Sequence, residues 1–179
     1  MSMIAENYAL ALYGLAKDEG VAELVLSQLE VLRDSFLAEP DYLRLLSSHN
    51  LDKKARCTVV DEAFRDKIHL YTLNFLKLLT EKGYARIFPD CVKAYRRQYN
   101  EENGIVSVLA VTAVALTSEQ AARLRDKLEQ VIGKKVILEN NVDPSCLGGV
   151  RLDYDGMRLD GTVINRLDAI SGLLKKTVL

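Results

Sequence analysis

The chain has 179 residues, of which 49% are hydrophobic and 27% are charged, and its formal net charge is −1. This length makes one large domain or two small ones, with enough apolar side chains for a packed core. The near-neutral charge provides no long-range attraction for nucleic acid or for an anionic membrane, which argues against proteins that bind either one mainly by charge.

The cysteines and the apolar runs bear on the compartment of the chain and on its association with a membrane. Cys57, Cys91 and Cys146 are odd in number and widely spaced, which predicts free thiols in a reducing compartment. The first residues carry no basic start followed by an apolar core, so we expect no secretory signal. The longest apolar run, 105–116, is too short for a membrane span of roughly 18 residues. We therefore expect no direct membrane insertion, and association with a membrane only through a partner.

Apolar residues recur at helical spacing through the first hundred positions and predict six helices joined by short turns. Gly20 and Gly83 are typical of residues that end a helix, and Pro40 separates two helices. The expected result is an antiparallel six-helix bundle. The clearest stripes are Tyr8/Leu12/Leu15, Val25/Leu29/Leu32/Phe36, Val59/Val60/Ala63/Phe64 and Phe88/Val92/Tyr95/Tyr99.

One predicted helix, 68–79, is apolar around nearly its whole circumference. A helix of this kind is either enclosed at the centre of a bundle or presents a second apolar face to a partner. The sequence leaves both possibilities open.

The pattern changes after the first hundred positions. Residues 105–116 are rich in valine and alanine and predict a strand that is buried on both faces. A second strand is predicted over 135–142. Residues 149–154 and 157–159 predict the two strands of a hairpin, because an Asp-Gly turn joins them.

Two helices are predicted among these strands. Thr117 and Gln120 form a capping box at the start of the first helix, whose apolar face is expected to include Val131, and Gly133 ends it. The spacing of apolar residues over 163–174 predicts a closing helix. The predicted fold class is therefore α+β, with a six-helix antiparallel bundle at 1–104 followed by a small α/β domain at 105–179.

We find no pattern that carries catalysis, and we predict a protein that is not an enzyme and binds no cofactor or metal. His49 and His69 lie in no metal-ligand or catalytic-triad spacing. Gly148 and Gly149 lack the lysine of a phosphate-binding loop, so they favour a backbone with a positive φ or a close approach where a strand begins. A calcium-binding EF-hand loop that begins at Asp153 is not predicted either, because the chain lacks the glycine and the glutamate that such a loop requires.

A row of basic and aromatic residues leaves one alternative function open. Lys93, Arg96 and Arg97 alternate with Tyr95 and Tyr99, a mixture that can bind single-stranded nucleic acid. The alternative is thus a nucleic-acid-binding regulator built on a helical bundle. Helical spacing instead places the tyrosines in the core and the basic groups in water, which favours a protein that binds no nucleic acid.

Several groups of residues resemble the delta subunit of F-type ATP synthase, whose mitochondrial counterpart is the oligomycin sensitivity-conferring protein. Residues 8–13 resemble the first helix of this family, and 78–83 resemble the end of its fifth helix. A C-terminal signature combines 142–145, 147–150 and 159–163 in order and at normal spacing.

The resemblance implies a non-catalytic stator subunit that links the catalytic alpha/beta head to the peripheral stalk. The subunit resists the torque of the rotor during ATP synthesis driven by ion flow. The bundle at 1–104 is expected to bind the N-terminal segments of alpha subunits, and the domain at 105–179 to contact the C-terminal ends of the b subunits. Such a subunit lies at the cytoplasmic face of the cell membrane as a peripheral part of the complex, or at the stromal face of the thylakoid in a plastid.

The resemblance also places the alpha segment between the first and fifth helices. Leu73, Leu76 and Leu79 are expected to serve the core, whereas for Tyr8 and Phe75 the sequence leaves a core role and a groove role open. The residues expected to bind the partner are Tyr8, Ala11, Leu12, Leu15, Tyr71, Phe75 and Leu78. The residues expected to shape the C-terminal domain for assembly are Asp143, Pro144, Gly148, Gly149, Asp160 and Gly161.

Because the sequence carries neither a phosphate-binding loop nor a metal-ligand cluster, the isolated chain should neither bind Mg-ATP tightly nor hydrolyse it. Calorimetric titration with Mg-ATP is expected to give no binding isotherm. A one-to-one isotherm in the micromolar range would show that the prediction is wrong.

Overall fold

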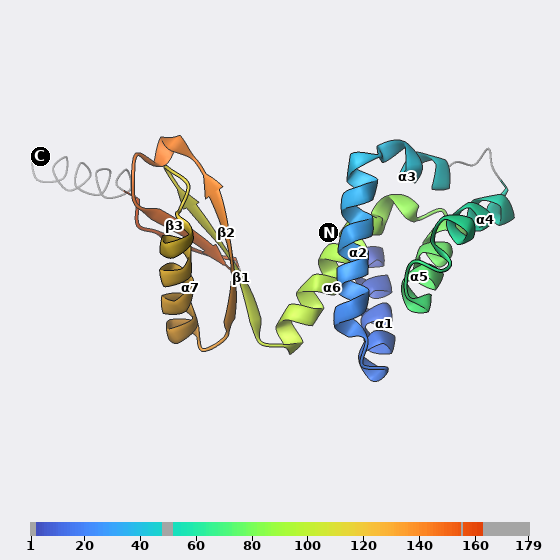
Figure 1. Cartoon of the computed structure of the whole chain (residues 1–179), viewed down its shortest axis with the longest axis horizontal. Helices are drawn as coiled ribbons and strands as arrows, with labels where there is room; N and C mark the ends of the chain where they lie inside the picture. Colours follow the sequence, from blue (N-terminus) through green and yellow to red (C-terminus); the bar gives the residue numbers. More distant parts are fainter. Residues whose placement is uncertain (1–2, 48–51, 155, 163–179) are drawn as a thin grey trace, which may run out of the picture. The chain divides into compact units, whose positions relative to one another are not determined.

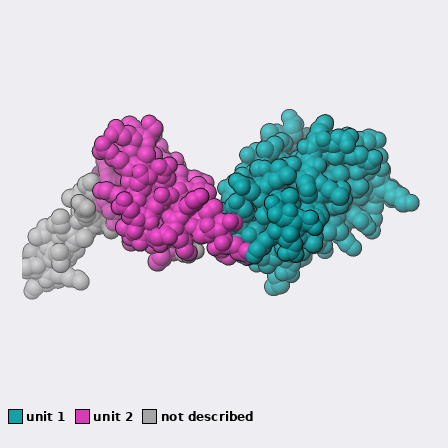
Figure 2. All heavy atoms as spheres, turned by 60° about the horizontal axis from the view of Figure 1, so that its bottom comes forward, with its two compact units in different colours: residues 1–100 teal, residues 101–179 magenta. Residues whose placement is uncertain are grey.

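The computed structural model of the chain describes residues 3–47, 52–154 and 156–162 (Figure 1). The chain divides into two compact units, residues 1–100 and 101–179 (Figure 2). The first unit is helical and the second combines helix and sheet, so the predicted α+β class is confirmed.

The N-terminal unit consists of helices with short connections. A single 3-10 turn, Ala85–Ile87, precedes the last of these helices, which runs two residues past the unit boundary. Pro40 begins its helix because it needs no N–H partner at that position. The helices are α1 (Met3–Asp18), α2 (Ala22–Ala38), α3 (Pro40–Leu46), α4 (Lys53–Phe64), α5 (Leu70–Glu81) and α6 (Phe88–Glu102).

The core of this unit draws on the predicted apolar stripes. Leu29 of α2, Leu76 of α5 and Tyr95 of α6 are among its largest fully buried side chains. The phenol of Tyr95 donates a hydrogen bond of 3.0 Å to the carbonyl of Ala22, which satisfies its one polar atom inside the core. Phe36 packs edge-on against Phe88, with ring centroids 5.3 Å apart.

The start of α5 differs from the prediction. The helix begins at Leu70 rather than at residue 68, because His69 is its N-cap and its Nδ1 accepts a hydrogen bond of 3.3 Å from the backbone N–H of Tyr71. The backbone N–H of His69 donates to Oε1 of Gln28, and Thr72 donates to the same oxygen. His69 thus has a structural role, while His49 lies outside the described residues.

The C-terminal unit contains a four-stranded sheet in the order β2-β1-β3-β4. β1 (Ile105–Thr112) pairs in parallel with β2 (Lys135–Val142), and α7 (Ser118–Ile132) makes the crossover between them. β3 (Val150–Tyr154) is antiparallel to β1 and forms the predicted hairpin with β4 (Met157–Asp160). A 3-10 turn at Pro144–Cys146 connects β2 to β3.

The first strand is shorter than predicted. It ends at Thr112, whose hydroxyl donates to the carbonyl of Val114 and turns the chain out of the sheet. The backbone N–H of Leu116 then donates to the side-chain Oδ1 of Asn140 in β2 instead of to a backbone carbonyl of the sheet. Burial of consecutive side chains, the sign of a strand covered on both faces, is confined to residues 110–112, and Ser107 is exposed.

The ends of α7 follow from its caps. Thr117 and Gln120 form the predicted capping box, with both reciprocal hydrogen bonds present, and Gly133 ends the helix at a φ of 72°. Val131, expected on the apolar face, is 85% exposed, because Ile132 continues the stripe of the helix at this point. The predicted closing helix at 163–174 lies outside the described residues.

The two compact units generate a prediction about fragments. A fragment of residues 1–104 contains every helix of the N-terminal core and should fold alone with a helical circular dichroism spectrum and a cooperative melt. The complementary fragment should melt at a lower temperature, since about 75 residues bury a smaller fraction of their surface. An unfolded 1–104 fragment would contradict the two-domain interpretation.

Candidate functional site

A groove with a volume of about 270 Å³ lies between α1 and α5. The structure brings all seven residues predicted to bind a partner into its lining and adds Asn74. The α1 side consists of Tyr8, Ala11, Leu12 and Leu15, and the α5 side consists of Tyr71, Asn74, Phe75 and Leu78. Whether a partner occupies this groove stays a prediction.

The lining residues differ in depth. Leu12 and Phe75 are each 5% exposed and therefore form the floor of the groove and part of the core at once. Leu15 is 56% exposed and Leu78 is 39% exposed, so they form its rim. Tyr8 is half-buried, with its ring edge-on to Tyr84 at a centroid distance of 6.2 Å. The groove thus presents apolar surface to solvent above a buried apolar floor.

Helical spacing explains why these side chains converge. On α1, Tyr8, Leu12 and Leu15 follow each other at i, i+4 and i+7, which places them on one face. Asn74 is not among the residues predicted from the sequence, because that prediction rested on the spacing of apolar residues only. Its position, three residues after Tyr71 and four before Leu78, is the signal that places it on the same face of α5.

In the C-terminal unit, the predicted assembly residues form two turns closed by aspartates. Asp143 accepts hydrogen bonds from the backbone N–H of Ser145 at 3.0 Å and from its hydroxyl at 2.6 Å. Asp160 accepts from the backbone N–H of Thr162 at 2.9 Å and from its hydroxyl at 2.7 Å. In each case the hydrogen bond from the hydroxyl, more than any other cause, lowers the pKa of the carboxyl below its usual value. Both aspartates therefore stay ionised at neutral pH and hold their turns.

The second turn lies against Gly149, which follows the first turn in the chain. The φ of Gly149 is 83°, and a Cβ on it would lie 2.4 Å from the carbonyl oxygen of Gly161 and 2.9 Å from the Cα of Thr162. The backbone N–H of Gly161 donates to the carbonyl of Val150 at 3.0 Å. The sequence predicted either a left-handed φ or a close backbone approach at Gly149, and the structure has both. Gly148, Pro144 and the rest of the predicted set lie in or beside these turns.

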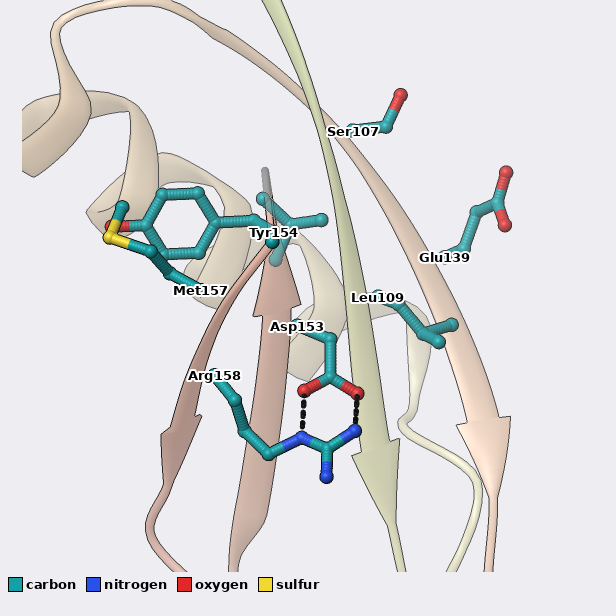
Figure 3. A pocket seen from close by; sticks show the side chains of 9 residues that line it. Ser107, Leu109, Glu139, Asp153, Tyr154, Met157 and Arg158 are labelled. Atoms are coloured by element: carbon teal, nitrogen blue, oxygen red, sulfur yellow. Dashed lines mark hydrogen bonds and ion pairs between the residues drawn. The ribbon is translucent and has the colours of Figure 1, made fainter. Parts of the chain in front are cut away.

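A second cavity, of about 520 Å³, lies over the sheet, and most of the side chains that line it are labelled in Figure 3. Arg158 Nε donates to Asp153 Oδ1 at 2.7 Å, and Arg151 also lies within ion-pair distance of this carboxylate. Two arginines therefore balance the charge of Asp153. Within 3–47, 52–154 and 156–162, no group of three or more His, Cys, Asp or Glu residues could hold a metal ion.

The basic and aromatic row on α6 does not form a platform for stacked bases. Tyr95 is fully buried. Arg96 pairs with Glu30 of α2 at 2.6 Å, and Arg97 lies 3.3 Å from Glu6 of α1. These arginines serve contacts between helices of the bundle. In the described part of the chain, no helix is both long and apolar enough to cross a membrane.

The family model described as "ATP synthase delta (OSCP) subunit" matches residues 4–174 of the chain. The chain belongs to this family. A relative from Lacticaseibacillus casei, "ATP synthase subunit delta", is 34% identical over 173 residues, with 96% of this chain and 95% of the relative covered. A relative of the same name from Alkaliphilus oremlandii is 30% identical over 174 residues, with 97% of each chain covered.

A solved structure from the mitochondrial ATP synthase hexamer of Toxoplasma gondii contains a chain with the same fold. Its TM-score is 0.76 at 21% identity, with 97% of this chain and 98% of that chain covered. The resemblance seen in the sequence is thus confirmed. Members of the delta (OSCP) family are non-catalytic structural subunits of ATP synthase, so this chain serves ATP synthesis without a catalytic site of its own.

The crowding at Gly149 generates a prediction about stability. Gly149→Asp should destabilise the C-terminal unit by more than the roughly 1–3 kcal/mol of a strained φ, because its Cβ also overlaps the backbone at Gly161. Hydrogen exchange resolved along the chain should show faster exchange in β1 and β3 and unchanged protection in α1 to α6.

Gly133→Asp is the matched control, since Gly133 also has a positive φ, of 72°, but a Cβ there would meet nothing within 4 Å. Gly133→Asp should therefore lower the stability of the C-terminal unit by less than Gly149→Asp does. Equal losses in the two variants would mean that the close backbone approach contributes nothing.

Proposed function

We propose that the chain is a stator subunit that links the catalytic alpha/beta head of ATP synthase to the peripheral stalk. In this role it holds the head against the torque of the rotor while ion flow drives ATP synthesis. The N-terminal unit binds the N-terminal segment of an alpha subunit, and the C-terminal unit contacts the C-terminal ends of the b subunits. The complex places it at the cytoplasmic face of the cell membrane, as a peripheral component.

The groove between α1 and α5 is the observation that carries this proposal. An amphipathic helix binds such a groove by burying apolar anchors spaced at i, i+3, i+4 and i+7. Leu15 and Leu78 offer exposed apolar rims for these anchors, and Leu12 and Phe75 offer the floor between them. Ala11 is small enough to let the backbone of a docked helix approach α1 closely. Family membership supports the choice of an alpha-subunit segment as the occupant.

The C-terminal unit supports the other half of the proposal with a rigid surface. Asp143 and Asp160 each fix a turn with two hydrogen bonds, and the second of these turns packs against Gly149. Turns that are fixed before binding lose little conformational entropy when a partner docks on them. We therefore assign the contact with the b subunits to the unit that carries these turns.

Rim residues of the groove should contribute to partner affinity rather than to folding. Leu78→Ala and Tyr8→Ala are each expected to weaken binding of a synthetic alpha N-terminal peptide about 5- to 100-fold, with a loss of stability of about 1 kcal/mol or less. Phe75→Ala should instead cost roughly 3–5 kcal/mol of folding stability, since Phe75 is buried. Thermal melting and titration calorimetry on each variant measure the two effects.

Val31→Ala is the control, because Val31 is 67% exposed on α2 and does not line the groove. Val31→Ala should change neither the affinity for the peptide nor the folding stability. Unchanged peptide affinity in both Leu78→Ala and Tyr8→Ala would rule out this groove as the alpha-binding site. Lost stability with retained affinity would mean that the two residues serve the core instead.

A further inference from the structure

Asn74 is an unusual member of the groove. Among the eight described residues that line it, Asn74 is the one with a carboxamide side chain, and the others are aliphatic or aromatic. It is exposed and lies on α5 between Tyr71 and Leu78, within the face that the groove presents. In the part of the chain that the structure describes, its carboxamide has no hydrogen-bond partner. Its hydrogen bonds in the free protein are therefore left to water.

A helix that fills the groove removes this water. A carboxamide has two N–H donors and a carbonyl acceptor, and burying such a group unpaired is costly. Asn74 lies between Tyr71 and Leu78 on the face that such a helix would cover, and its short side chain keeps the carboxamide close to α5. Tyr8 and Tyr71 differ in this respect, since a phenol carries its hydroxyl at the far end of a long ring and can leave it in water. Asn74 therefore needs a partner on the docked helix itself.

We infer that Asn74 sets the register of the helix that occupies the groove. The inference rests on the proposed function and names a further property of the same site. The apolar lining accepts many amphipathic helices, whereas Asn74 accepts only those that place a hydroxyl, amide or carboxylate side chain opposite it. A single buried asparagine selects register in the same way in helical coiled coils, at a cost in affinity. The structure thus assigns affinity to the leucines and aromatic rings, and selectivity to Asn74.

A double-mutant cycle with the full chain tests this assignment. The probe is a synthetic peptide of the alpha-subunit N-terminus, together with a set in which each polar residue is replaced in turn by alanine. In the wild-type chain, one of these replacements should weaken binding about 5- to 100-fold, since it leaves Asn74 buried without a partner. In Asn74→Leu and Asn74→Ala the same replacement should cost less than about 2-fold, because no amide remains to be satisfied.

Thermal melting of both variants controls for folding, and it should be unchanged because Asn74 is exposed. Equal costs of every peptide replacement in the wild-type and variant chains would overturn the role of Asn74. If Leu78→Ala still weakens binding in that case, the groove itself stands and only the selectivity of Asn74 fails. A wild-type chain that does not bind the peptide would overturn both.

Discussion

Burial of α5 against the rest of the helical bundle is the interaction on which the N-terminal unit depends. Leu73, Leu76 and Leu79 point into the core, and each fully buried leucine contributes roughly 1.5–3 kcal/mol. Phe75 belongs to this core and also to the floor of the groove. Folding and the shape of the groove are therefore coupled, because a change that loosens α5 also deforms the surface offered to a partner.

The C-terminal unit relies on a different constraint, the close approach of Gly149 to the turn at Gly161. Only a hydrogen atom fits between Gly149 and the carbonyl of Gly161, and two aspartates keep the turns in place with hydrogen bonds from Ser145 and Thr162. The apolar floor of the groove tolerates side chains of similar volume, whereas a backbone contact tolerates no side chain at all. The two units thus differ in how much sequence change each site allows.

Both sites fit a protein that holds partners and performs no chemistry. Some charged groups within the described residues form internal contacts: Arg96 pairs with Glu30 between helices, and Arg158 pairs with Asp153 on the sheet. Partly exposed ion pairs of this kind add little stability. The proposed stator role would benefit from wide apolar contacts, because these have no preferred direction and are not screened by salt as exposed charges are.

The sequence by itself determined the six helices, the order of strands along the chain and seven of the eight groove residues, because helical spacing and the family resemblance are local properties of the chain. It also predicted a special backbone at Gly149. Only the tertiary structure decided that Phe75 is both core and floor, and that Gly161 is the neighbour that crowds Gly149. It likewise ended β1 at Thr112 and began α5 at Leu70, through contacts to Val114 and Gln28. Each of these depends on which distant or non-periodic residue lies opposite, and no spacing along the chain contains that information.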